Sequence, residues 1–386
     1  MNFDYLTPVD DAVFAHAMVL SEQSLGHQIR IHSNQFGTPD LSGVRFAIVA
    51  IEEGRGAIDN EETGQGLDNV RKEIYQLYPG NWITTMVDLG NIKQGSTIDD
   101  TYFAVKEVVS SLIKKNIIPI IIGGGQDLTY ANYRAYDVLE QTVNIVSVDN
   151  KFDFGSIQDG ISSQSYLSSI VMEKPNNLFN FSNIGYQTFF NPQEEIDLVN
   201  DLFFDAYRLG EVAKNLELVE PVLRDADIVS VDIGAVRNSE APANNNATPN
   251  GFYGEDLCVI ARYAGISDKV SSFGIYEYNP RYDNKRQTAQ LIAQAIWYFV
   301  EGVNCRANDY PFGTKDSYQK FMVPIEDEVL NFYKSDKSGR WWMEINFKNN
   351  NKYQRHSLIP CTYQDYLNAN EQEIPDRWYK TLKKVI

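Results

Sequence analysis

Five short runs of apolar, mostly β-branched residues constrain the fold of this chain more than any other feature of its sequence. They cover residues 45–51, 117–122, 143–148, 227–231 and 270–276. Apolar residues in these runs are continuous rather than alternating with polar ones, which is typical of strands buried on both faces of a parallel sheet. The runs therefore predict a central sheet that is covered on both sides.

Segments with a helical spacing of apolar residues separate these runs. One begins after Ser96, a candidate N-cap, and ends near Asn116, a second covers residues 287–302, and a third, of mixed character, covers residues 193–216. Strands that alternate with helices form right-handed βαβ units. We therefore predict an α/β protein with three layers, α/β/α, around a mostly parallel central sheet.

The C-terminal part has a different composition. Residues 303–386 are rich in Tyr, Lys and Asn, contain an isolated aromatic and apolar run at 340–347, and end in a basic segment at 380–384. We predict a domain over residues 1–302 and a C-terminal extension over residues 303–386. The extension is expected to pack on the same core as an additional strand and helix, because aromatic-rich segments rarely stay free in solvent. The alternative is a docking surface for a protein partner, built on Trp341, Trp342 and the basic end.

Charge and hydropathy exclude two classes of partner. The 386 residues include 34 Lys and Arg against 52 Asp and Glu, a net charge of −18, so nucleic acid, which binds basic surfaces, is not an expected partner. The N-terminus lacks the pattern of a secretory signal, and no apolar stretch is long enough to cross a bilayer. We therefore predict a cytoplasmic protein without a membrane partner.

Histidine and cysteine are scarce. The three cysteines are odd in number and far apart, which argues against a disulfide framework and against a thiolate metal site. The only histidines are His16, His27, His32 and His356. The small number of histidines therefore argues against a site that needs several imidazole side chains.

Polar residues follow four of the predicted strands. Asp149 and Asp232 each end the sequence IVSVD, Glu277 follows the run at 270–276, and the run at 117–122 leads through three glycines to Gln126. The carboxyl ends of strands border the ligand crevice of an open α/β sheet, so we expect these residues, with Asp153, in one cleft. Taken alone, an aspartate at a strand end is more often a cap or turn residue than a catalytic group.

The order of four motifs is more informative. GGGQD at 123–127, DNKFD at 149–153, SVDIGAVRNSEAP at 230–242 and IYEYNPRYD at 275–283 together resemble the ureohydrolase superfamily of arginases, agmatinases and formiminoglutamases. The three glycines with an acid two positions later, and the SEAP segment, are most similar to the formiminoglutamase branch. The resemblance runs from about residue 35 to residue 302 and implies an arginase-like fold.

The resemblance also implies a metal centre, which this sequence keeps only in part. Active members hold two manganese ions with six side chains, and the bridging hydroxide attacks an amidine or guanidine carbon. Asp149, Asp153 and Asp232 keep their ligand positions. The family's two histidines are replaced by Gln126 and Lys151, and its remaining aspartate by Gly234. Three of the six ligands are therefore lost.

The remaining ligands imply at most one metal ion. Gln126 would add an amide oxygen to Asp149, Asp153 and Asp232, and such an all-oxygen set suits Mn²⁺, Mg²⁺ or Ca²⁺. Lys151 would replace the second cation through ion pairs with Asp149 and Asp232. The expected cofactor is therefore none, or one divalent cation.

Two functions remain open. The first is an inactive ureohydrolase-like protein whose cleft is structural or binds a ligand, because hydroxide generation depends on metal charge and no histidine lies in the matched motifs. The second is a C–N hydrolase of formimino, amidino or guanidino compounds with one metal or none. In that enzyme Lys151 would stabilise charge, Asp149 or Asp232 would act as base, and Glu277 would bind the cationic substrate.

The resemblance implies two further properties. Ser162 and Ser163 match a substrate-loop region of the family, which makes them candidate substrate-binding residues. Family members commonly self-associate, so a homo-oligomer is expected.

Overall fold

A mostly parallel sheet forms the centre of the computed structural model, which describes residues 4–82, 85–139, 141–311, 314–325, 328–345 and 358–385. The strand order is β1-β4-β3-β5-β10-β9-β6-β7-β8, with β2 beside β4, and only the β1–β4 pair is antiparallel. The strands are β1 (Leu6–Thr7), β2 (Arg30–Ile31), β3 (Val44–Glu52), β4 (Thr85–Lys93), β5 (Ile118–Ile122), β6 (Val143–Val148), β7 (Leu178–Tyr186), β8 (Asp205–Arg208), β9 (Ile228–Asp232) and β10 (Ser272–Tyr276).

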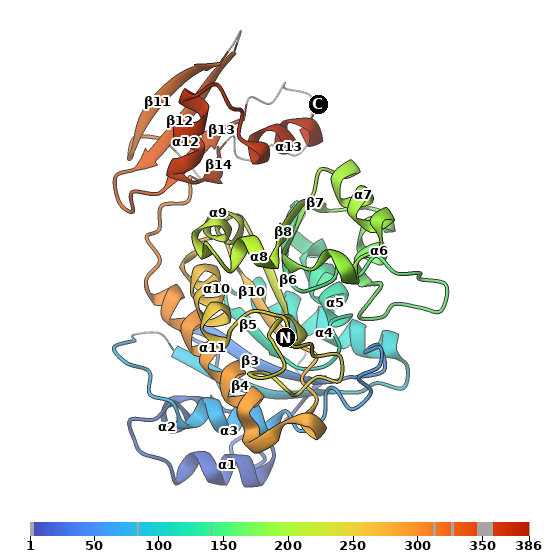
Figure 1. Cartoon of the computed structure of the whole chain (residues 1–386). Coiled ribbons are helices and arrows are strands. Elements are labelled where there is room, and N and C mark those ends of the chain that lie inside the picture. Colours follow the sequence, from blue (N-terminus) through green and yellow to red (C-terminus); the bar gives the residue numbers. More distant parts are fainter. Residues whose placement is uncertain are drawn as a thin grey trace.

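Helices cover both faces of this sheet (Figure 1). They are α1 (Asp11–Met18), α2 (Leu25–Gln28), α3 (Asp68–Gln76), α4 (Ile98–Ile113), α5 (Leu128–Arg134), α6 (Tyr166–Met172), α7 (Gln193–Asp201), α8 (Leu209–Val212), α9 (Glu220–Arg224), α10 (Gly254–Ile266) and α11 (Gln287–Asn304). Two apolar cores result. In β5, Ile118, Ile120 and Ile122 pack into the core that contains α10 and α11, whereas Ile121 packs into the core that contains α4. The predicted three-layer α/β/α fold is confirmed.

Two details of the helix predictions need correction. The N-cap of α4 is Thr97 rather than Ser96, because the Thr97 hydroxyl accepts from the Asp100 N–H and the Asp100 carboxylate accepts from the Thr97 N–H. Residues 193–216 are not one helix. Phe203 adopts a left-handed backbone conformation (φ 54°) just after α7, and the chain then enters β8, which pairs with β7.

The end of α4 offers a test of local backbone strain. Asn116 is exposed and adopts φ 56°, a conformation that Asn tolerates better than most residues and that Gly adopts freely. We expect Asn116→Ala to lower the free energy of unfolding by about 1 kcal/mol relative to Asn116→Gly. Urea unfolding of the two variants measures the difference, and equal stabilities would show that the left-handed conformation costs nothing here.

The C-terminal extension forms a sheet of its own instead of adding to the central one. Strands β11 (Tyr318–Ile325), β12 (Glu328–Ser335), β13 (Trp341–Glu344) and β14 (Leu358–Cys361) are antiparallel and, within the described ranges, pair only with one another. Helices α12 (Tyr363–Asn370) and α13 (Asp376–Val385) complete it. The predicted extra strand on the same core is therefore wrong, because the extension has enough apolar residues, including Phe332, Trp341 and Met343, for a separate core.

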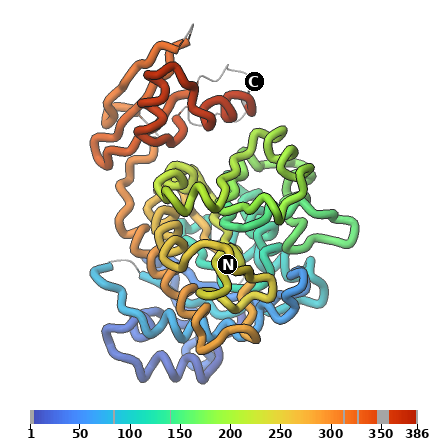
Figure 2. Tube along the Cα trace, in the orientation of Figure 1, coloured from blue at the N-terminus to red at the C-terminus, as the bar shows by residue number. Residues whose placement is uncertain are grey.

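The extension lies at one end of the molecule and contacts the central domain (Figures 1 and 2). Lys380 of α13 lies 3.7 Å from Asp205 of β8, and the Lys384 ammonium donates to the side-chain oxygen of Asn180 in β7. Trp342 is fully buried and Trp341 nearly so, which removes these two residues as an exposed docking surface. The end of the predicted run at 340–347, and His356, lie outside the described residues.

The described helices include none that is long and apolar enough to cross a membrane.

Candidate functional site

The ends of four adjacent strands bring the candidate residues together. Strands β5, β10, β9 and β6 are neighbours in the sheet, and Gln126, Glu277, Asp232 and Asp149 lie at or after their respective carboxyl ends. Next to them is a cavity of about 200 Å³. Its lining residues are Asn150, Lys151, Asp153, Ser163, Gln164, Phe190, Asp232, Gly234, Asn246, Thr248 and Glu277.

Glu277 is held by hydrogen bonds from two directions. Its Oε1 accepts from the backbone N–H of Gln126 (2.9 Å), and its Oε2 accepts from Nδ2 of Asn60 (2.8 Å). Burial raises the pKa of Glu277 to about 7, an effect that these hydrogen bonds oppose and that Asp149 strengthens. The residue also adopts a left-handed backbone conformation (φ 67°), a strained geometry that is enriched at functional sites.

Three aspartates gather beside Glu277. Burial raises the pKa values of Asp149, Asp153 and Asp232, and the charge of Asp149 raises those of its two neighbours further. Asp149 Oδ2 and Asp153 Oδ2 are buried acceptors without a donor among the described residues. One shared proton or one cation would satisfy both oxygens.

Asp232 is fixed differently. Its Oδ1 accepts from the backbone N–H of Gly234 (2.6 Å) and from Nδ2 of Asn244 (3.3 Å). The protein itself therefore already supplies two hydrogen-bond donors to Asp232 Oδ1.

The side-chain nitrogen of Gln126, not its oxygen, faces the serine hydroxyls of β6 and β9. Nε2 donates to the hydroxyls of Ser147 (3.2 Å) and Ser230 (3.4 Å), and a hydrogen bond from the same side chain lowers the pKa of Asp149. A metal ion would need the amide oxygen at this place. In this orientation Gln126 satisfies hydroxyl and carboxylate oxygens instead.

Lys151 lines the cavity but forms no ion pair within 4 Å in the described part of the chain, so the predicted pairs with Asp149 and Asp232 are absent. Instead, its backbone N–H donates to Asp149 Oδ1 (2.9 Å) and its carbonyl accepts from Asn183 (2.7 Å). At longer range, the ammonium still lowers the pKa values of Asp149, Asp153 and Asp232. The backbone contacts of Lys151 fix the loop after β6. Its ammonium affects the three aspartates at longer range, without a direct contact.

The two candidate serines have different surroundings. Ser163 lines the cavity, and its Oγ accepts from the backbone N–H of Ile58 (3.1 Å). Ser162 is not among the lining residues and shares a hydrogen bond with the Ser165 hydroxyl (2.9 Å).

Two buried residues near the cleft were not among the predicted site residues. Asn60 bridges the Glu277 carboxylate and the side chain of Asn279, which donates to Asn60 Oδ1 (2.9 Å). Asp127 accepts from the Tyr102 hydroxyl (2.7 Å), and burial raises the pKa of Asp127 to about 7. Asn60 stands in the loop after β3 and is separated from Glu277 by 217 residues, so no local pattern indicates their contact.

A comparison with known families agrees with this arrangement. A model described as "Arginase family" matches residues 43–301, which is more than half of the chain. The chain belongs to the arginase family. A formimidoylglutamase of Staphylococcus aureus (strain MSSA476) is 24% identical over 274 residues, covering 67% of this chain and 86% of the relative.

Solved structures of the arginase family have the same fold. Trypanosoma cruzi formiminoglutamase with manganese superimposes with a TM-score of 0.64 at 19% identity, over 70% of this chain and 97% of that one. Bacillus subtilis formimidoylglutamase gives 0.64 at 17% identity, over 72% and 91%. Agmatine ureohydrolase of Thermoplasma volcanium gives 0.59 at 20% identity, over 74% and 95%.

The arginase-family residues of this chain do not fit a pair of metal ions. Gly234 has no side chain to offer, and the Asp232 Oδ1 beside it is bound by two N–H donors. Within the described ranges, no three or more His, Cys, Asp and Glu side chains are arranged to hold a metal ion. The oxygens of Asp149 and Asp153 that lack donors are the only part of the predicted set that suits a single cation.

Proposed function

We propose that this chain is an arginase-family protein that has lost dimanganese catalysis and keeps the cleft as a structural or ligand-binding feature. The observation that supports this most strongly is the environment of Asp232. Its Oδ1 accepts from Gly234 and Asn244, and Lys151 and Gly234 line the cavity at positions where the resemblance implies a histidine and an aspartate.

The chemistry argues in the same direction. Two metal ions lower the pKa of a bound water, orient it and stabilise the developing tetrahedral charge. No histidine is among the residues that line the cavity, so the usual proton shuttle near neutral pH is also missing. Burial raises the pKa values of Asp153 and Asp232, the distant charge of Lys151 lowers both, and the hydrogen bond from Gly234 lowers that of Asp232.

Metal analysis tests the proposal. We expect the protein, produced with manganese supplied, to retain no more than about one divalent ion per chain after gel filtration. It should also hydrolyse N-formimino-glutamate, arginine and agmatine no faster than its Asp232→Ala variant. About two manganese ions per chain, or turnover that depends on Asp232, would contradict it.

A second candidate function is a C–N hydrolase with one metal or none. The buried carboxyl group of Glu277, which lines the cavity together with Lys151 and Asp232, favours a site able to bind a cationic amidine. Turnover of any of the three compounds that falls in both Lys151→Ala and Asp232→Ala, with the fold intact, would support it. Unchanged turnover in both variants would exclude this mechanism.

A further inference from the structure

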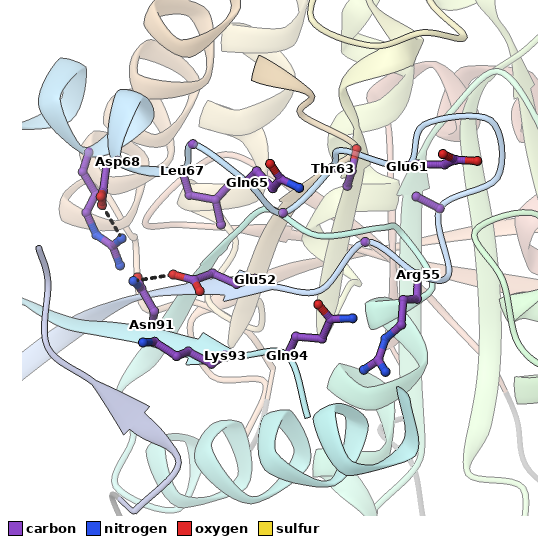
Figure 3. Close-up of a pocket in the computed structure, with 15 residues that line it drawn as sticks. Glu52, Arg55, Glu61, Thr63, Gln65, Leu67, Asp68, Asn91, Lys93 and Gln94 are labelled. Carbon is purple, nitrogen blue, oxygen red and sulfur yellow. Dashed lines mark hydrogen bonds and ion pairs between the residues drawn. The ribbon is translucent and has the colours of Figure 1, made fainter. Parts of the chain in front are cut away.

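A second and larger pocket lies where β3 and β4 end and the chain leads into α3 (Figure 3). Its volume is about 800 Å³, within the range of small-molecule sites. It shares no lining residue with the cavity beside Asp232. The lining residues are Glu52, Gly54, Arg55, Ala57, Glu61, Thr63, Gly64, Gln65, Gly66, Leu67, Asp68, Arg71, Asn91, Lys93 and Gln94.

Opposite charges stand side by side in this pocket without forming an ion pair. Glu52 ends β3 and is in register with Lys93, which ends β4. Glu52 Oε1 accepts from Nδ2 of Asn91 (2.7 Å), whereas Lys93 has no carboxylate within 4 Å among the described residues. In Figure 3 the side chains of Glu52 and Lys93 both extend toward Asn91.

Two buried oxygens in the pocket wall also lack partners. Asn91 is 8% exposed and Thr63 2% exposed, and neither Asn91 Oδ1 nor the Thr63 hydroxyl has a hydrogen-bond partner in the described structure. Buried polar atoms are almost always satisfied by protein, water or a ligand. Asn91 Oδ1 therefore adds an acceptor next to the Glu52 carboxylate.

Most other charges of the pocket are already paired. Arg55 binds Glu53 at 2.6 Å. Arg71 is fully buried and binds Asp88 at 2.9 Å and Asp68 at 3.1 Å. What remains at this end of the pocket is one carboxylate with an amide oxygen and one ammonium. That is too few carboxylates for a divalent cation and too few cations for a phosphate.

We propose that this pocket binds a small zwitterion of the α-amino acid class, with its ammonium at Glu52 and Asn91 Oδ1 and its carboxylate at Lys93. A ligand of this kind completes the ion pairs that Glu52 and Lys93 do not form with each other. Its ammonium also supplies a donor to the amide oxygen of Asn91. The site is independent of the chemistry in the cleft.

Calorimetry with the full-length protein tests the proposal. Each of the common L-amino acids is titrated at millimolar concentration, and the tightest binder is compared with its decarboxylated amine and its deaminated acid. We expect at least one amino acid to bind, and both analogues to bind at least about tenfold more weakly, because each lacks one charge-assisted contact.

Variants locate the bound ligand. Glu52→Gln keeps an oxygen for Asn91, and Lys93→Gln changes an exposed residue, so both should fold. Each should weaken binding about tenfold or more. The matched control Glu107→Gln removes an exposed carboxylate of α4 that is not among the lining residues of the pocket, and it should change nothing.

Three results would overturn the proposal: no common amino acid binds, the decarboxylated amine binds as well as the amino acid, or binding is unaffected by both pocket variants. Loss of binding in Asp232→Asn alone would assign the ligand to the cleft instead, which contradicts this pocket while leaving the proposed function standing.

Discussion

Arg224→Ala is expected to lower the free energy of unfolding by about 3–5 kcal/mol, because it removes one partner from a buried charged cluster. Arg224 ends α9 in the central domain and is 2% exposed. Its guanidinium donates to the carbonyls of Trp341 and Cys361, both at 3.0 Å, in two strands of the extension. The substitution leaves two buried carbonyls without these donors.

The same side chain makes two further contacts that alanine cannot replace. The guanidinium carbon lies 4.5 Å from the ring centroid of Trp342, which is fully buried, and a terminal nitrogen lies 3.1 Å from Glu220. Burial lowers the pKa of Arg224, and Glu220 opposes this effect. Loss of Arg224 therefore opens a space beside Trp342 and leaves Glu220 with fewer partners.

Urea unfolding and limited proteolysis measure the effect. We expect the extension of Arg224→Ala to be cleaved faster than that of the unchanged protein. Arg262→Ala is the matched control, because Arg262 forms a single ion pair with Glu301 and its side chain is 39% exposed. That control should stay within about 0.5 kcal/mol. Equal stability of the two variants would mean that Arg224 does not hold the two parts together.

The central sheet could be predicted because its strands are continuous apolar runs. The run at 143–148 coincides with β6, and the predicted bounds of β3, β5, β9 and β10 differ from the observed ones by at most two residues. β4 and β7 were missed because polar residues interrupt them: Asp88 and Asn91 in β4 and Asn180 and Asn183 in β7. All four residues are buried, and their partners, among them Arg71 and Asp205, come from distant parts of the sequence.

The candidate site was predictable to the level of the backbone. Parallel strands deliver their carboxyl ends to one edge, so the gathering of Asp149, Asp232 and Glu277 follows from the order of the strands. The directions in which the side chains point do not follow from the order of the strands. Lys151 makes its short contacts through its backbone, and the extension pairs its own strands because antiparallel hairpins close locally, which composition alone does not indicate.

Restoring the family's ligand types is expected to restore metal binding. The triple variant Gln126→His, Lys151→His and Gly234→Asp returns two imidazoles and a carboxylate to the positions from which the resemblance says they are missing. It also removes the donating amide of Gln126 and the ammonium of Lys151 from the neighbourhood of Asp149. We expect manganese content to rise to about two ions per chain, since neutral imidazoles and carboxylates suit this ion.

Of the three substitutions, Gly234→Asp adds a side chain where the structure has none, and its neighbours can make room for it. A Cβ at this position would lie 3.0 Å from Asn244 Nδ2 and 3.0 Å from Asp232 Oδ1, so these side-chain ends must move by a few tenths of an ångström. Moving Asn244 also frees the Asp232 oxygen that it now occupies. The backbone needs no change, because Gly234 is not among the residues with positive φ.

Equilibrium dialysis with elemental analysis measures the bound manganese, and circular dichroism verifies the fold of each variant. The matched control carries the same three substitutions together with Asp232→Asn, which removes a carboxylate that the resemblance assigns to the metal centre and should abolish the gain. A folded triple variant that binds no more manganese than the unchanged protein would show that the cleft lost more than its ligands. A gain that depends on Asp232 would instead mean that the substitutions at 126, 151 and 234 account for the loss of the dimanganese centre, because the remaining carboxylates are already placed around it.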